Sequence, residues 1–331
     1  MEHETQDRED RADMVAALIR AAGRRTMPPE DAYQQVLGAA TAAFRKKSAR
    51  RRDRTWLTWA AAAGIAAFAV ALLLQWGPTS TQPPPVAMVA RIIGTVELGH
   101  DGGWKPMTEM GATLAKGAML RTLAGGSAAL ALDGGASLRL AAATEVLLDG
   151  SRRIYLRSGT VYLDNGGSVG TGHQIETPAG TARDVGTQFE LRVIGGALRL
   201  RVREGRVEID RAGQLLAGAA GEQLEIDALG GVTRSHIAAT DMAWQWAESI
   251  GPAPDIDGQP VTRLLTWVAR ETGRQLRYES AAVESRAASV ILHGNIRHLA
   301  PLAALEVMLA TTDLEYTLIG DRMEVRARTE P

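Results

Sequence analysis

The sequence of 331 residues contains no cysteine, which excludes disulfides, cysteine-ligated metal sites and a thiol nucleophile. It also lacks an excess of charge. The formal net charge is −1, so no overall field points to nucleic acid or to acidic substrates. Glycine is abundant instead, with 35 residues, mostly beyond residue 90, which is typical of a turn-rich β region. A chain of this length has room for two or three domains.

The sequence motifs of common enzymes are missing too. No H-E-x-x-H, G-x-S-x-G or P-loop sequence occurs. Asp-Gly pairs predict hairpin turns rather than calcium loops, because neither an EF-hand nor a repeated G-G-x-G-x-D pattern is present. The histidines are scattered without the spacing of metal ligands: His3, His100, His173, His236, His293 and His298. The sequence therefore predicts no enzyme, with no catalytic residue, no cofactor and no metal.

Residues 56–76 are predominantly apolar and contain no Asp, Glu, Lys or Arg. As a helix this stretch is about 32 Å long, which matches the roughly 30 Å hydrocarbon core of a bilayer. Trp56, Trp59 and Trp76 lie near its ends, where indole rings favour the headgroup region. We therefore predict a single transmembrane helix at 55–77. A buried core helix and a cleaved signal peptide are the alternatives, and both fit the length and flanks less well.

Basic residues directly before this stretch predict its orientation. Arg51, Arg52 and Arg54 follow a basic run that begins at Arg45, whereas the next charged residue after Trp76 is Arg91. The positive-inside rule places residues 1–54 in the cytoplasm, as a short helical region, and the rest across the membrane. Because this basic run lies directly next to an apolar span, it favours this topology over the alternative interpretation as a nucleic-acid-binding patch. The prediction is a single-pass inner-membrane protein with its C-terminal domains in the periplasm.

Beyond a proline-rich linker at 78–88, the hydrophobic period changes to two. Short alternating runs at 91–98, 128–132, 137–140, 145–148, 153–156 and 160–163 are separated by glycine and Asp-Gly turns. Strands at this spacing predict an all-β domain at 89–227, built as a sandwich, barrel or solenoid.

Residues 173–210 are the most distinctive part of that domain. Thr177-Pro178 restricts a turn, and Gly180 and Gly186 permit backbone that other residues would strain. Phe189, the only phenylalanine beyond the apolar span, predicts a bulky core residue. Glu204-Gly205 predicts a hairpin that joins strands at 198–202 and 207–209.

These residues carry a family resemblance. Three pieces resemble the signature of the FecR (ferric-citrate regulator) domain and occur in its order: Thr177, Pro178 and Gly180; Asp184, Gly186, Thr187 and Phe189; Glu204 and Gly205. The resemblance implies a β domain in the periplasm on a single-span inner-membrane protein. It also implies a TonB-dependent transducer as the periplasmic partner and an extracytoplasmic-function sigma factor as the cytoplasmic one.

A second linker is expected at 228–254, where we expect Trp244 and Trp246 to pack between domains. Residues 255–328 predict an α+β domain with a weak internal βαβ repeat. Its expected helices are at 261–271 and 300–309, and its strands at 255–257, 275–278, 290–293, 314–319 and 322–325. This segment resembles the short N-terminal domain of secretins and TonB-dependent receptors.

The sequence thus predicts a multidomain signal-transduction regulator that spans the membrane and acts by binding rather than by chemistry. The alternative is a membrane-anchored periplasmic scaffold of an envelope assembly with no sigma-factor role. Residues 1–54 contain no tryptophan, whereas the cytoplasmic region usual in the family is a longer helical domain with tryptophan, so both functions stay open.

Overall fold

The computed structural model describes residues 85–100, 102–166, 172–184 and 186–328. The described residues all belong to one compact unit that begins at residue 80. The predicted transmembrane helix and its anchoring residues lie outside the described residues. Within the described part of the chain, no helix is long and apolar enough to cross a membrane.

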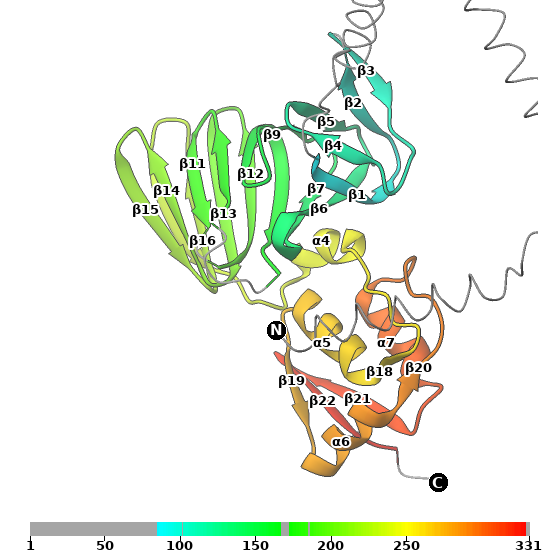
Figure 1. The fold of residues 1–331 in the computed structure, drawn as a ribbon. Coiled ribbons are helices and arrows are strands. Elements are labelled where there is room, and N and C mark those ends of the chain that lie inside the picture. The colour runs from blue at the N-terminus through cyan, green and yellow to red at the C-terminus, as the bar shows by residue number, and fades with distance from the viewer. Residues whose placement is uncertain (1–84, 101, 167–171, 185, 329–331) are drawn as a thin grey trace, which may run out of the picture. The chain divides into compact units, whose positions relative to one another are not determined.

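Two β layers form the larger part of this unit (Figure 1). We name them sheet A and sheet B. In spatial order, sheet A contains β4 (Thr113–Ala115), β1 (Pro85–Ile93), β6 (Ser127–Leu132), β7 (Ser137–Leu140), the second half of β9 (Arg153–Asp164), β12 (Gln188–Ile194), β13 (Ala197–Glu204), β16 (Glu222–Ile226) and β17 (Val232–His236).

Sheet B contains, in the same manner, β3 (Gly103–Pro106), β2 (Val96–His100), β5 (Ala118–Thr122), β8 (Glu145–Leu148), the first half of β9, β10 (Gln174–Thr177), β11 (Gly180–Asp184), β14 (Arg206–Arg211) and β15 (Gln214–Ala219). The pairing of β9 with β10 is parallel. A short 3₁₀ turn, η1 (Asp133–Gly135), connects β6 to β7.

The long strand β9 belongs to both sheets and joins them into one hydrogen-bonded network. It changes sheet at Gly159, where φ is +98° and a Cβ would lie 2.5 Å from Thr144. On either side of this point, alternate residues of β9 point into a single core between the layers: Ile154, Leu156, Val161 and Leu163. Period-two alternation is what a two-layer β core requires.

The all-β prediction is confirmed, and the packing is that of a sandwich. The winding also has a coil-like feature, because successive strand pairs alternate between the layers: β10 and β11 lie in sheet B, β12 and β13 in sheet A, β14 and β15 in sheet B, β16 and β17 in sheet A.

The prediction of a hairpin at Glu204-Gly205 is wrong. Strand β13 pairs with β12 and β16 in sheet A, whereas β14 pairs with β11 and β15 in sheet B. Gly205 therefore carries the chain from one layer to the other. The run predicted at 91–98 is likewise interrupted, at Gly94 with φ +63°, so that β1 and β2 lie in different sheets.

The segment expected to be a linker, 228–254, contains β17, the 3₁₀ turn η2 (Met242–Trp244) and helix α4 (Gln245–Ile250). Helix α4 contacts β1 and β6 of sheet A. In this part of the chain the sandwich is thus covered by helical structure.

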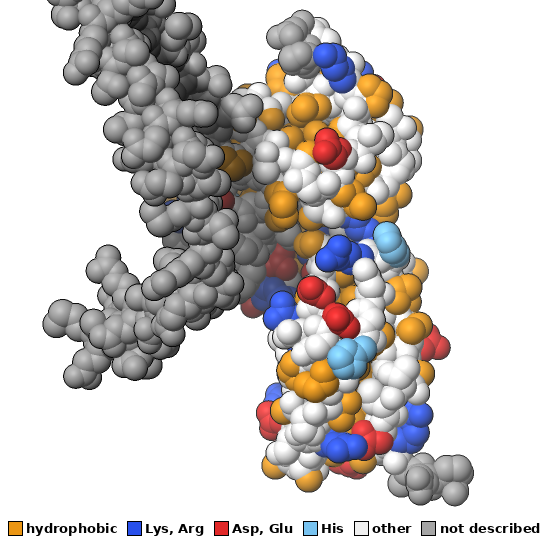
Figure 2. Space-filling view, turned by 45° about the vertical axis from the view of Figure 1, so that its right-hand side comes forward, with side chains coloured by type: hydrophobic (Ala, Val, Ile, Leu, Met, Phe, Trp, Pro, Cys, Tyr) orange, Lys and Arg blue, Asp and Glu red, His pale blue; other side chains and the backbone are white. Residues whose placement is uncertain are grey.

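The C-terminal module has a core of its own. It contains helices α5 (Val261–Glu271), α6 (Ala281–Ser289) and α7 (Pro301–Leu309), the pair β18 (Gln259–Pro260) and β20 (Ile291–Leu292), and a sheet in the order β19 (Gln275–Tyr278), β22 (Arg322–Ala327), β21 (Leu314–Ile319). Strand β19 pairs in parallel with β22, so the predicted α+β class is confirmed for this segment. On the face that Figure 2 shows, basic and acidic side chains are interspersed with hydrophobic ones.

Two local predictions for this module are wrong. No strand forms at 255–257, and β18 begins at Gln259 instead. Helix α6 was not predicted, because it buries only Val283 and Ala287 and has no long apolar stripe. The sequence does contain an N-cap signal, because serine is a favoured N-cap residue. In the structure, Ser280 accepts a hydrogen bond from the Val283 amide at 3.3 Å.

The first testable prediction concerns the sandwich core. Phe189 on β12 is fully buried, so Phe189→Ala is expected to lower the free energy of unfolding by about 3–5 kcal/mol. Ile194→Ala on the same strand is the matched control, because Ile194 is 52% exposed and its loss is expected to be within about 0.5 kcal/mol. Chemical denaturation of an 85–328 fragment measures both, and equal losses would contradict the assigned core position.

Candidate functional site

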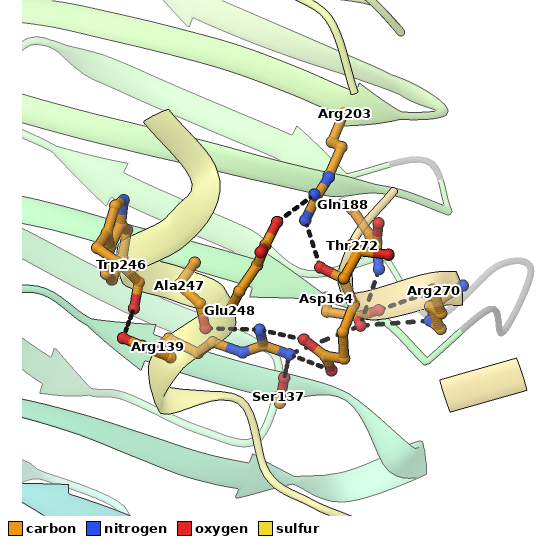
Figure 3. A network of polar contacts seen from close by, with 12 residues as sticks. Ser137, Arg139, Asp164, Gln188, Arg203, Trp246, Ala247, Glu248, Arg270 and Thr272 are labelled. Carbon is orange, nitrogen blue, oxygen red and sulfur yellow. Dashed lines mark hydrogen bonds and ion pairs between the residues drawn. The ribbon is translucent and has the colours of Figure 1, made fainter. Parts of the chain in front are cut away.

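The outer face of sheet A carries charged side chains that are buried rather than solvated. Helix α4, the turn η2 and the C-terminal end of α5 cover this face (Figure 3). We call the resulting polar contact region the seam, and define it by the following residues: Arg139, Tyr162, Asp164, Gln188, Arg203, Trp244, Glu248, Arg270, Glu271 and Thr272.

Arg139 of β7 is the centre of the seam. Its side chain is 1% exposed, and its two terminal nitrogens donate to the two carboxylate oxygens of Glu271 at 2.6 and 2.8 Å. The same guanidinium donates to the Ala247 carbonyl of α4 at 2.9 Å. Burial opposes the charged form, but the Glu271 carboxylate outweighs it, so the pKa of Arg139 lies above its ordinary value. Such paired bonds are short, directional and stronger than neutral ones.

Arg203 of β13 forms a second set of contacts with the covering helices. Its Nε donates to the Ala239 carbonyl at 2.6 Å, and its terminal nitrogens donate to the Glu271 carbonyl at 2.7 Å and to Glu248 at 2.6 Å. The close approach of the end of α5 to Arg203 and Ala239 depends on Gly273. Its φ is +63°, and a Cβ there would lie 2.3 Å from the Ala239 carbonyl oxygen. Two arginines of sheet A thus share Glu271, one through its carboxylate and one through its backbone.

Asp164, at the end of β9, forms the third contact of the seam. It is held by the Arg270 guanidinium, by the Gln188 side-chain amide at 3.0 Å and by the Gly166 amide at 2.9 Å. Burial by itself would raise the pKa of Asp164, but the hydrogen bond and charge of Arg270 outweigh it, so the pKa lies below its ordinary value. Arg270 also reaches Glu204 at 3.4 Å.

Two aromatic rings fill the space between these charges. Tyr162 of β9 and Trp244 of η2 are both buried and meet edge to face, with ring centroids 5.9 Å apart. The Arg139 guanidinium lies over Tyr162 and the Arg203 guanidinium over Trp244, which adds cation–π attraction. Burial raises the pKa of Tyr162. Nearby, Trp246 donates its indole N–H to Glu190 at 2.9 Å, so both tryptophans of the expected linker contact sheet A.

The residues of the first signature piece lie at a turn. Thr177 donates its hydroxyl to the Gly180 carbonyl at 2.7 Å and accepts the Ala179 amide at 3.0 Å, which closes the β10–β11 turn around Pro178. Gly180 has φ +140°, and a Cβ there would lie 2.9 Å from the Asp210 carbonyl oxygen of β14. This piece positions the backbone and presents no reactive group.

The second and third pieces meet where the chain changes sheet. Thr187 donates its hydroxyl to Asp184, and a Cβ at Gly205 would lie 2.5 Å from the Gly186 carbonyl oxygen. His173 is also buried here, with Nδ1 3.7 Å from Asp184. Phe189 lies in the core just beyond, while Glu204 extends to Arg270 of the seam. Val185, between Asp184 and Gly186, lies outside the described residues.

The structure therefore does not gather the signature residues into one cleft, but places them at turns and sheet changes. Among the described residues there is no group of three or more His, Asp or Glu that could hold a metal ion. The seam was not foreseen, because charged residues at alternate strand positions ordinarily indicate a solvated face. The only sequence signal was a cluster of arginines on β13 at 199, 201 and 203.

Residues 118–208 match the family model FecR protein. The matched segment runs from β5 into β14 and includes every signature residue named above. This chain carries a FecR domain. The sheet A side of the seam, including Arg139, Asp164 and Arg203, belongs to the FecR match, whereas Glu248, Arg270 and Glu271 lie beyond it.

Among solved structures, two crystal structures of a "putative anti-sigma factor" from Parabacteroides distasonis ATCC 8503 are similar to this chain. The structure at 1.65 Å resolution has 14% identity and a TM-score of 0.36, covering 62% of this chain and 97% of the other. The structure at 2.50 Å has 14% identity and a TM-score of 0.35, covering 64% and 99%. Similarity at this level carries no conclusion about a partner. No curated protein matches the chain.

The second prediction tests the central pair of the seam. Glu271→Ala leaves the Arg139 charge buried without its carboxylate, which is expected to cost about 3–5 kcal/mol of unfolding free energy. The double variant Arg139→Met with Glu271→Leu is expected to recover most of that loss, because apolar residues of similar volume replace a buried pair at little cost.

The matched control is Glu315→Ala. Glu315 forms an ion pair of 2.8 Å with Arg326 on the surface, and surface pairs contribute about 0–1 kcal/mol. Denaturant unfolding compares the variants. A Glu271→Ala loss no greater than that of Glu315→Ala would contradict the central place given to Glu271.

The third prediction is a pH dependence. Because the pKa of Asp164 is lower folded than unfolded, its contribution is complete above its ordinary value of about 3.8 and is lost as the pH falls through the folded value. The difference in unfolding free energy between the native protein and Asp164→Asn is therefore expected to be constant near neutral pH and to shrink below about pH 4. A difference that does not change between neutral and acidic pH would show that the Asp164 carboxylate gains nothing from Arg270.

Proposed function

We propose that this chain is a membrane-spanning regulator of the FecR type. In this proposal a periplasmic protein, of the TonB-dependent transducer type, binds the described domains, and residues 1–54 contact an extracytoplasmic-function sigma factor in the cytoplasm. The FecR match at 118–208 supports a regulatory role. The uncharged stretch at 56–76, with basic residues before it, supports the anchoring in the inner membrane.

The observation that carries the proposal is the seam itself. The C-terminal module has a separate hydrophobic core, yet the end of α5 is fixed to the FecR domain through Arg139, Arg203 and Asp164. A partner that binds the module differently in two arrangements of the seam would shift the equilibrium between them. Signal transfer of this kind requires binding and no chemical step.

A scaffold without a sigma factor is the second candidate. It is favoured by one observation, the absence of tryptophan from residues 1–54, where the resemblance leads us to expect a tryptophan-containing helical domain. In this case the same periplasmic domains dock an envelope assembly, and residues 1–54 have no partner.

The fourth prediction separates the parts of the proposal by co-purification from membranes. The full-length chain is expected to fractionate with inner membranes and to retain both a periplasmic protein and a sigma factor. A chain that ends at Pro254 is expected to stay in the membrane and keep the sigma factor but to lose the periplasmic protein, because it lacks the module with its own hydrophobic core to which docking is assigned.

A chain that lacks residues 1–50 is the complementary variant, expected to lose the sigma factor alone. If no form retrieves a sigma factor while the periplasmic partner is retained, the scaffold is the correct function. If the chain ending at Pro254 retains the periplasmic protein in equal yield, docking belongs to the FecR domain instead. Recovery of the full-length chain outside the membrane fraction would contradict the anchoring.

A further inference from the structure

A second polar region lies on the outer face of sheet A, at the turn ends of β12, β13, β16 and β17. It is an open pocket of about 410 Å³, a volume within the range of small-molecule sites. None of the seam residues lines it. The outward-pointing side chains of the pocket are Arg192, Ile194, Ala197, Arg199, Glu225, Asp227 and Thr233.

The two basic groups of this pocket differ in their partners. Arg192 has no hydrogen bond or ion pair with any described residue. It lies directly opposite Arg199 in the β12–β13 pairing, and like charges in that position repel. Arg199 bonds to Glu190 at 2.9 Å, but its Nε is buried without a hydrogen-bond partner in the described structure. The Arg199 guanidinium thus has one acidic partner, and its Nε remains without a hydrogen bond.

The acidic groups on the other side of the pocket form no close ion pair, although the charge of Glu225 acts on Arg201. Glu225 accepts only the side-chain amide of Gln223 at 3.0 Å. Asp227 accepts the amides of Leu229 and Gly231, both at 2.8 Å. Neither carboxylate forms an ion pair with a described residue.

The register separates Arg192 from the acidic side of the pocket, whereas Arg199 lies directly opposite Glu225. Arg192 pairs across the sheet with Arg199, and Arg199 pairs with Glu225. Adjacent strands are about 4.8 Å apart, so the backbones at Arg192 and Glu225 are roughly 10 Å apart, with Arg199 between them. The pocket therefore presents a positive end and a negative end. Ile194, which is 52% exposed, adds an apolar wall.

We propose that this pocket binds a small zwitterion, an α-amino acid or a short peptide. Its carboxylate accepts hydrogen bonds from Arg192 and Arg199, its ammonium group donates to Glu225 and Asp227, and an apolar side chain packs on Ile194. One ligand thereby gives Arg192 an acidic partner and gives Glu225 and Asp227 a basic one. The proposal is independent of the regulator function and adds a ligand site to the FecR domain.

The test is isothermal titration calorimetry on the full-length chain with three matched probes. Alanyl-leucine carries both charges, N-acetyl-alanyl-leucine lacks the ammonium group and alanyl-leucine amide lacks the carboxylate. The dipeptide is expected to bind about tenfold or more tightly than either derivative, since a hydrogen bond to a charged group is worth about that factor.

The variants separate the two ends. Arg192→Gln is expected to weaken dipeptide binding about tenfold while leaving that of the amide unchanged, and Glu225→Gln is expected to weaken the dipeptide equally while sparing the acetylated form. Arg183→Gln, at an exposed position of sheet B, is the matched control and is expected to change nothing. Retained thermal unfolding midpoints show that each variant is folded.

Three results would overturn the proposal. The first is no heat of binding for the dipeptide at about 10 mM, where even a Kd near 1 mM is detectable. The second is equal binding of the dipeptide and its acetylated form, which would make the pocket a plain anion site. The third is an effect of Arg192→Gln no larger than that of Arg183→Gln.

Discussion

The bidentate pair of Arg139 and Glu271 is the constraint on which the arrangement of the two domains depends. A guanidinium that is 1% exposed is tolerable only where acceptors surround it, because an unpaired buried charge is very costly. Sheet A supplies the Ser137 hydroxyl at 3.4 Å, α4 the Ala247 carbonyl and α5 the carboxylate. Three elements from distant parts of the sequence must therefore be in register at once. Close contact also restricts Gly251, where a Cβ would lie 2.8 Å from Glu271.

The FecR signature serves a different purpose from the seam, although the two meet. Its glycines at 186 and 205 permit the close backbone approach where the chain passes between layers. Glu204, at that same point, reaches Arg270. The position of the sheet change thus determines where Glu204, the last residue of β13, lies and that it contacts Arg270 of α5. A turn that looks purely structural helps to place one edge of the contact between domains.

Hydrophobic alternation was enough to predict the β domain, the core position of Phe189 and the bounds of α5, β19 and β21. The reason is that these features depend on neighbours in sequence and on burial. Neighbours in sequence do not determine which sheet a strand joins. Glu204-Gly205 was therefore predicted as a hairpin, whereas the chain passes there from sheet A to sheet B. The seam was not predicted from the sequence for the same reason. A charged residue on an outer strand face is equally compatible with water and with a partner 132 positions away, and nothing local distinguishes them.

The seam is expected to make a point substitution more damaging than a deletion. In a chain without α4 and α5, Arg139 and Arg203 would lie on an open sheet face and regain water, so their desolvation cost would disappear together with the lost contacts. In the complete chain without the Glu271 carboxylate, the covering helices still exclude water while the main acceptor is gone. The FecR domain is therefore expected to survive loss of its neighbour better than a mismatch with it. The stability of the FecR domain is thus expected to depend strongly on the position of the C-terminal module on sheet A, and only weakly on its presence.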